Sequence, residues 1–202
     1  MSGIVLAGTW MSGALVSFLL MAIAGRELST ELNTFQILFF RSVIGLVLIL
    51  AILSWSGWAQ VRTTKFSLHF IRNIAHYVGQ FGWFYAISLI PLAQVFAIEF
   101  TIPIWTAMLA PFLLSERLSA SRILVIVIGF IGILIILRPG MVPFEIGAIS
   151  ALIAALGYAL SHMLTKKLTR TDSPLTVIFY MTVIQLPVGA IPTALDWTTP
   201  SM

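Results

Sequence analysis

Cysteine is absent and charge is scarce in this chain of 202 residues. Without cysteine there is no disulfide scaffold, no thiolate metal site and no cysteine nucleophile. Charged residues make up 9% of the chain, whereas an ordinary soluble domain carries about 25%. A soluble fold with so little charge could not cover its own surface. The composition therefore excludes a disordered tail, a nucleic-acid-binding protein and a globular enzyme of the usual kind.

Apolar residues fill the place of the missing charge, at 59% of the chain and a mean hydropathy of +1.05. We expect an all-α integral membrane protein whose solvent is the lipid bilayer. A spanning helix needs about 20 mostly apolar residues, and seven such runs occur. The predicted spans are Gly3–Ala24, Asn33–Trp55, Phe70–Leu89, Leu92–Leu114, Ser121–Leu137, Ile146–Thr165 and Leu175–Leu195.

The basic residues predict the orientation of these spans, because Lys and Arg accumulate on the cytoplasmic side. Arg26 and Arg138 fall on one side of the membrane, and Arg41 lies inside the second span. The first span has no preceding basic residue and is too long for a signal-peptide core, so we expect an uncleaved helix. We predict a multi-pass protein of the bacterial inner membrane with its N-terminus in the cytoplasm and its C-terminus outside. The eight remaining basic residues mark the cytoplasmic side: Arg62, Lys65, Arg72, Arg117, Arg122, Lys166, Lys167 and Arg170.

A weak internal match appears when the chain is compared with itself at a shift of 140 residues. Phe39-Phe40 then aligns with Phe179-Tyr180, and the polar breaks at 29–33 and 169–173 coincide. Apolar helices also match by chance, so this similarity is suggestive only. A repeat with five spans, an odd number, must enter the membrane in the opposite direction in its second copy. We therefore predict one complete five-helix unit at residues 1–140 and the first two helices of an inverted repeat at residues 141–202.

Several short motifs resemble the drug/metabolite transporter superfamily, and specifically its EamA-type transporters. They are Phe35 to Arg41, Tyr85 to Ala93, Pro103 to Pro111, Ser115-Glu116-Arg117-Leu118 and Arg138-Pro139-Gly140. The resemblance implies ten spans in two inverted halves and both termini in the cytoplasm. It also implies transport of small metabolites, often amino acids or related compounds, and commonly outward.

The chain departs from that pattern because it stops after the seventh predicted span. Either the sequence is a truncated form, which would make it partial or inactive, or a second copy in a homodimer supplies the missing helices. The leading expectation is a secondary transporter, with no cofactor and no enzymatic activity. An intramembrane lipid-modifying enzyme and a non-transporting membrane scaffold are the alternatives. The enzyme is disfavoured because no catalytic motif or paired acidic metal site is found.

Two charged residues lie deep inside predicted spans. Inserting a charged side chain at such a depth costs about 2.5–3.5 kcal/mol on insertion scales, so each of them is expected to have a structural or functional role. Arg41 and Glu99 are both expected ~5 Å to the external side of the midplane, from the rise of 1.5 Å per residue. We hypothesise that they share a cavity, as an ion pair or as partners for the two charges of a zwitterionic substrate. The alternative is a purely structural pair, or an Arg41 side chain that snorkels to the interface.

Polar residues form a stripe along one face of the third predicted span, at Asn73, His76, Gln80 and Trp83. Such a face turns toward a cavity or another helix when lipid surrounds the bundle. His76 could carry protons, because the reference pKa of histidine lies near neutrality, or it could make an interhelical hydrogen bond. The sixth span carries a similar face that includes Tyr158.

Proline is expected to interrupt two other spans. Pro103 frees the backbone carbonyl of Glu99, and Trp105 nearby could stack on a ligand or pack against lipid. Pro187 and Pro192 suggest a second broken helix, near Gln185. Coupling to protons would use Glu99 or His76, and we predict no catalytic and no metal-binding residue. The predicted substrate-binding set is Arg41, His76, Gln80, Glu99, Pro103, Trp105 and Tyr158.

Overall fold

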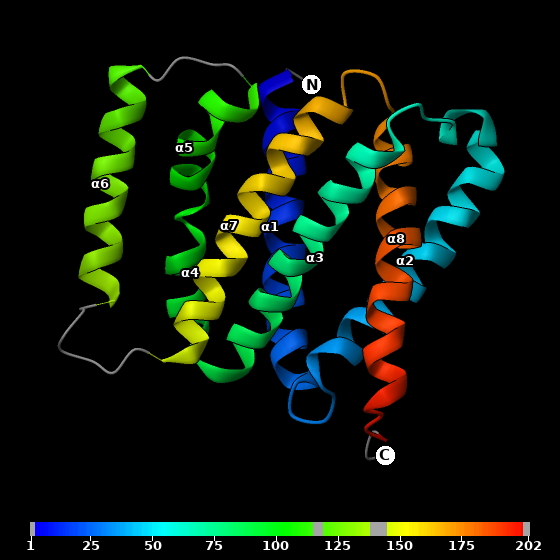
Figure 1. The fold of residues 1–202 in the computed structure, drawn as a ribbon, viewed down its shortest axis with the longest axis horizontal. Coiled ribbons are helices and arrows are strands. Elements are labelled where there is room, and N and C mark those ends of the chain that lie inside the picture. Colours follow the sequence, from blue (N-terminus) through cyan, green and yellow to red (C-terminus); the bar gives the residue numbers. More distant parts are fainter. Residues whose placement is uncertain (1–2, 115–118, 138–144, 200–202) are drawn as a thin grey trace.

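The computed structural model describes residues 3–114, 119–137 and 145–199, and these residues form helices without any strand. Figure 1 shows the helices running roughly side by side. The charged motifs around residues 115–118 and 138–140 lie outside the described residues. The helices are α1 (Gly3–Leu28), α2 (Thr34–Ser56), the short 3₁₀ helix η1 (Trp58–Val61), α3 (Phe66–Leu89), α4 (Leu92–Glu99), α5 (Ile102–Leu114), α6 (Ala120–Leu137), α7 (Ile146–Leu168) and α8 (Pro174–Leu195).

Five segments are long and apolar enough to cross a membrane. They are α1, α2, the pair α4–α5 (Leu92–Leu113), α7 and α8. The two other predicted spans coincide with α3 and α6, which do not meet the same criterion within the described residues. The start of α1 lies at one end of the bundle and the end of α8 at the other (Figure 1). The all-helical membrane fold is therefore confirmed, whereas the count of seven spans stays a prediction.

The centre of the bundle is the pair α3 and α7, which share the most extensive contact in the molecule. Glycine makes this approach possible. A Cβ on Gly82 would lie 2.7 Å from the Ser150 carbonyl oxygen, and one on Gly157 would lie 2.8 Å from the Ala75 carbonyl oxygen. The Ser150 hydroxyl donates to the Gly82 carbonyl at 2.9 Å and bridges the two backbones. Small residues thus set the interhelical distance, as is usual where helices pack in lipid.

The pair α2 and α8 forms the second large contact, and polar residues join it at both ends. Asn33 caps α2, and its amide also donates to the carbonyl of Asp196, just beyond the end of α8. At the opposite end Ser173 caps α8 and donates to the side chain of Gln60, just beyond the end of α2. Each helix is therefore capped at its start by a residue that also binds the segment following its partner.

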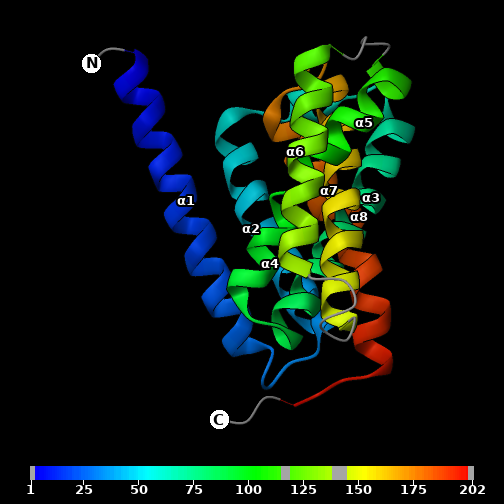
Figure 2. The ribbon, with the colours of Figure 1, turned by 90° about the vertical axis from the view of Figure 1, so that its left-hand side faces the viewer.

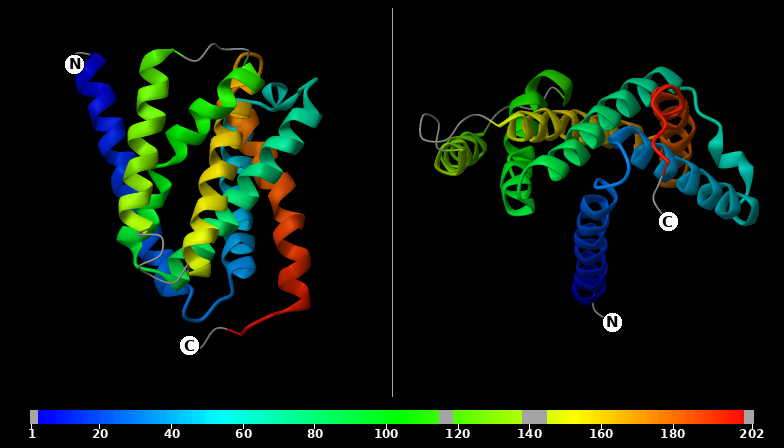
Figure 3. Two further views of the ribbon diagram at one scale, coloured as in Figure 1. Left: turned by 60° about the vertical axis from the view of Figure 1, so that its left-hand side comes forward. Right: turned by 90° about the horizontal axis from the view of Figure 1, so that it is seen from below.

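Helix α1 leans away from the rest of the bundle, as Figures 2 and 3 show. Its apolar side chains, such as Trp10 and Leu15, are exposed along most of its length. It meets the bundle near Gly25, where an added Cβ would lie 2.6 Å from the Phe84 ring. The C-terminal part of α1 thus packs against α3, and the N-terminal part stands apart from α2.

The two predicted helix breaks have different outcomes. The fourth span is interrupted at Phe100 and Thr101, within the turn that precedes Pro103, as expected because proline cannot donate to the carbonyl of Glu99. The helix resumes at Ile102, with Pro103 in its first turn. The break predicted for the last span is wrong, since α8 continues through Pro187 and Pro192. Each proline removes one backbone hydrogen bond, and the rest of the helix stays intact.

Candidate functional site

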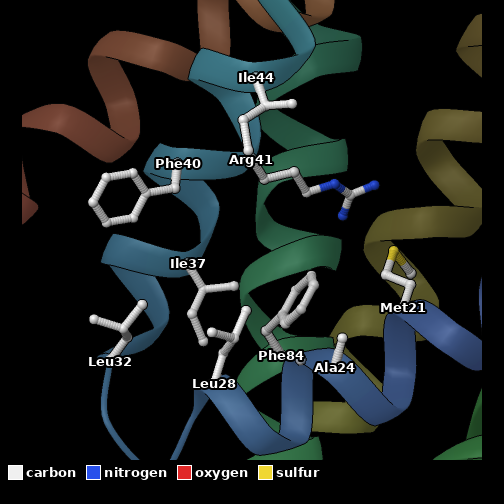
Figure 4. Close-up of a pocket in the computed structure, with 10 residues that line it drawn as sticks. Met21, Ala24, Leu28, Leu32, Ile37, Phe40, Arg41, Ile44 and Phe84 are labelled. Atoms are coloured by element: carbon white, nitrogen blue, oxygen red, sulfur yellow. The ribbon is translucent and has the colours of Figure 1, made fainter. Parts of the chain in front are cut away.

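Arg41 lies on α2 between two pockets and is the one charged residue that lines both. The first, called the Arg41 pocket here, has a volume of about 370 Å³ and lies between α1, α2 and α3 (Figure 4). The second, called the polar pocket, has a volume of about 250 Å³ and lies between α2, α3 and α8; its polar lining includes Ser42, Gln80, Thr182 and Gln185. Within the described part of the chain the Arg41 guanidinium makes no hydrogen bond or ion pair. Its central carbon lies 5.8 Å from the centre of the Phe84 ring, within cation–π range.

Glu99 ends α4 at the helix break and is bound by a neighbour other than Arg41. The indole Nε1 of Trp83 donates to its Oε2 at 2.8 Å, and Trp83 itself is almost fully buried. The ion pair considered between Arg41 and Glu99 is not present among the described residues. Among the described residues that line the two pockets around Arg41, neither Glu99 nor Tyr158 is found. Arg41 and Glu99 thus carry opposite charges within the bundle and are not paired with each other among the described residues.

His76 and Gln80 extend this region along α3. The side-chain amide of Gln185 donates to His76 Nδ1 at 3.0 Å and to the backbone carbonyl of Asn73 at 3.2 Å. The His76 ring also packs edge-on against Tyr158, with ring centres 5.6 Å apart. His76 thus makes the interhelical contact that was one of its two predicted roles, and Gln80 lines the polar pocket.

The last two predicted site residues stay at the helix break and line neither pocket around Arg41. Pro103 is exposed in the first turn of α5. The Trp105 indole donates to the Thr101 hydroxyl at 3.0 Å, which closes the turn between α4 and α5. Their position supports a role in shaping the break below Glu99.

Two important residues were missed or misread in the sequence. Phe84 supports the Arg41 guanidinium, and its place could not be read from one more aromatic residue in an apolar helix. Arg72 was counted as a topology signal, but it is buried on α3 and donates to Thr165 at 2.9 Å and to Asn73 at 2.7 Å. Its position four residues before His76, and so on the same helix face, is the signal that could have revealed it.

A second polar cluster joins the α2–α3 and α7–α8 connections outside the spans. Asp172 Oδ2 lies 2.7 Å from His69 Nε2 and accepts a hydrogen bond of 2.6 Å from the Thr63 hydroxyl. Partial burial acts to raise the pKa of Asp172, but the hydrogen bonds from Thr63 and His69 outweigh it and hold that pKa below its usual value. The cluster ties together two connections that are far apart in the sequence.

The arrangement of helices and polar residues can be compared with known proteins. Residues 5–138 match the family described as the EamA-like transporter family. The chain belongs to this family. It is therefore a membrane transporter-family protein and not an enzyme, which removes the alternative of an intramembrane lipid-modifying enzyme.

Relatives of this EamA-like chain carry names for several small metabolites. An S-adenosylmethionine uptake transporter of Rickettsia prowazekii (strain Madrid E) is 28% identical over 95% of this chain and 65% of its own length. A riboflavin transporter of Brucella anthropi is 34% identical over 80% of the chain and 57% of its own length. A pseudopaline exporter of Pseudomonas aeruginosa is 27% identical over 77% of the chain and 55% of its own length.

These alignments also show how much of each relative's length the chain covers. It spans 65% of the length of the Rickettsia relative and less of the two others. No solved structure matches it significantly.

Proposed function

We propose that this chain forms the substrate-binding core of a secondary transporter for small, amino-acid-like metabolites that carry both charges. The observation that supports it best is the separation of Arg41 from Glu99. Arg41 makes no ion pair among the described residues, and Glu99 is bound by the neutral Trp83 indole, so neither charge is compensated by the other. A charge held in an apolar membrane interior needs an opposite charge, and a zwitterion supplies one to each. Its carboxylate would bind Arg41, and its ammonium group would bind Glu99.

The path around this site would be assembled from the predicted inverted repeat. Asn33 and Ser173 are 140 positions apart, as the repeat requires, and both cap a helix while binding the segment that follows the partner helix. This two-way pattern supports residues 1–140 as the first unit and residues 141–202 as the beginning of the second. Because the chain spans 65% of the Rickettsia relative, we propose that further helices complete the wall, either from the rest of a longer chain or from a second copy.

Direction and coupling are finer proposals. We propose outward transport, as the family resemblance implies, with the N-terminus in the cytoplasm of the cell and the α8 end outside. Relatives named for uptake and for export both occur, so direction needs its own measurement. We propose that Glu99 couples transport to protons by binding either a proton or the ammonium group of the substrate. The described neighbour that binds its carboxylate, the Trp83 indole, is neutral, so either a proton or the ammonium group can neutralise the charge.

Transport by proteoliposomes tests this proposal. Vesicles containing the chain would be loaded with a labelled panel of amino acids, S-adenosylmethionine and riboflavin, and efflux would be followed with and without a proton gradient. The proposal expects efflux of a zwitterionic compound that Arg41→Gln and Glu99→Gln each abolish and that Arg62→Gln leaves unchanged. Efflux that is the same in Glu99→Gln as in the unmodified chain would refute the role of the carboxylate.

A further inference from the structure

Among the described residues that line the Arg41 pocket, Arg41 is charged and the others are apolar. Figure 4 shows Arg41 reaching from α2 across the pocket above Phe84, with Met21 and Ala24 of α1 on the far side. Its volume of about 370 Å³ is within the range of about 300–1,000 Å³ that is usual for small-molecule sites. The described residues that line it are Met21, Ala24, Gly25, Leu28, Leu32, Ile37, Phe40, Arg41, Ile44 and Phe84.

The guanidinium determines the charge of the occupant. None of the described residues that line this pocket is acidic, and none of the described acidic residues forms an ion pair with Arg41. An arginine inside an apolar membrane pocket is costly unless an anion accompanies it, and its planar fork of N–H donors matches a carboxylate. Phe84 restricts the guanidinium from one side and leaves its edge available to a ligand. The pocket is therefore suited to an anionic group at Arg41.

The rest of the lining determines the body of the occupant. The side chains beyond Arg41 are aliphatic or aromatic, so a polar body would lose its hydration without gaining hydrogen bonds. The polar pocket on the other side of Arg41 is smaller, at about 250 Å³, and would suit a polar body instead. The C-terminal part of α1, from Met21 to Leu28, lines the Arg41 pocket. The rest of this helix stands apart from α2 (Figure 2). An amphipathic molecule fits this position.

We infer that the Arg41 pocket binds a small amphipathic organic acid, with its carboxylate on Arg41 and its apolar or aromatic body against Phe84 between α1 and α2. This inference rests on the proposed function for transport and adds to it the chemistry of the part of the ligand beside Arg41, a carboxylate attached to an apolar body. The site accepts a carboxylate with an apolar body more readily than a compound that is polar throughout.

Binding can be measured on the full chain without any transport. Phosphatidylcholine nanodiscs carrying the protein would be equilibrated with radiolabelled phenylpropionate. Competitors would be phenylpropanol, which lacks the charge, phenylpropylamine, which reverses it, and propionate, which lacks the ring. We expect saturable binding of phenylpropionate and affinities at least about tenfold weaker for each competitor, since a charged hydrogen bond and a buried ring are each worth that much or more. Equal affinity for phenylpropanol would overturn the inference.

Variants locate the ligand within the protein. Arg41→Gln should weaken binding by about tenfold or more, Arg41→Lys should lose less, and Ala24→Phe should abolish binding by filling the pocket. Arg62→Gln removes an exposed charge far from the pocket and should change nothing. Circular dichroism and size-exclusion chromatography would confirm that each variant is folded. If Gln185→Leu in the polar pocket lowers affinity while Ala24→Phe does not, the ligand lies elsewhere and the inference is wrong.

Two further results separate this inference from competing explanations. Replacing phosphatidylcholine with phosphatidylglycerol should leave phenylpropionate binding unchanged; its loss would assign Arg41 to a lipid phosphate instead. Binding of phenylpropionate without transport of any compound would refute the proposed function and leave the pocket assigned. Transport of a zwitterion without binding of phenylpropionate would support the proposed function and refute the assignment of the Arg41 pocket.

Discussion

The contact between α3 and α7 makes a strong prediction about Gly157. An added Cβ would lie 2.8 Å from the Ala75 carbonyl oxygen and 2.9 Å from the Gly79 nitrogen. Both are backbone atoms, so no side-chain rotation can relieve the overlap, and the two helices must separate by several tenths of an ångström. Overpacking of this kind costs about 1–3 kcal/mol.

Alanine also favours the helix over glycine by about 0.5–1 kcal/mol, which partly offsets the overlap. For Gly157→Ala we therefore expect a net loss of ~1–2 kcal/mol in the free energy of unfolding. Gly8→Ala is the matched control, because a Cβ at Gly8 on α1 meets no atom within 4 Å. That variant should be neutral or slightly more stable.

The assay is reversible unfolding of the purified chain in mixed micelles with increasing sodium dodecyl sulfate, followed by far-ultraviolet circular dichroism. The difference between the two glycine variants separates helix propensity from packing. If Gly157→Ala unfolds at the same detergent fraction as Gly8→Ala, then α3 and α7 are not in the close contact described above, and the reasoning fails.

Three other perturbations test separate parts of the structure. Asp172 is stabilised in its charged form by His69, so its contribution to stability is present above the pKa of an unfolded aspartate, about 3.9, and is lost as the pH falls through its lower folded pKa. The protection of the two joined connections against hydrogen exchange, measured relative to the intrinsic exchange rate at each pH, should therefore fall at acidic pH, and Asp172→Asn should remove that dependence. Asn33→Ala deletes the cap of α2 and should lower the free energy of unfolding by about 1 kcal/mol, measured in mixed micelles. Trp83→Phe removes the hydrogen bond to Glu99 and should alter the pH profile of transport while leaving the chain folded.

The controls and contrary results for these three are simple. Asp196→Asn should not change the acid dependence of exchange, because Asp172 carries the contact. Thr30→Ala, near the cap on the same connection, should be close to neutral for unfolding, and a cost equal to that of Asn33→Ala would contradict the capping role. An unchanged pH profile in Trp83→Phe would show that the indole does not tune the carboxylate.

The sequence was a good guide to the helices, because long apolar runs and capping residues are local signals. The second span was predicted to start at Asn33, which caps α2. The sixth was predicted to start at Ile146 and the seventh to end at Leu195, and α7 and α8 have these bounds. Family membership also followed from local motifs. Both are properties of consecutive residues, for which a single sequence contains the necessary information.

The parts that were mispredicted depend on packing between helices. Depth along a helix can be counted, so Arg41 and Glu99 were placed at similar levels, but their lateral positions follow from how α2 and α4 rotate within the bundle. In the structure Glu99 accepts a hydrogen bond from Trp83, and no ion pair joins it to Arg41 among the described residues. Arg72 was counted as a cytoplasmic charge at the entrance of the third span, although hydrogen bonds to residues of α3 and α7 hold it inside the bundle.

The most direct test of the central claim is one ratio, the initial efflux rate of a zwitterionic metabolite from proteoliposomes containing Arg41→Gln divided by the rate with Arg62→Gln. Both variants remove one positive charge, but only Arg41 lines the pockets between α2 and its neighbours. We predict a ratio of about one tenth or lower, because a charged hydrogen bond to the substrate is lost. A ratio near one would show that Arg41 does not bind the transported compound.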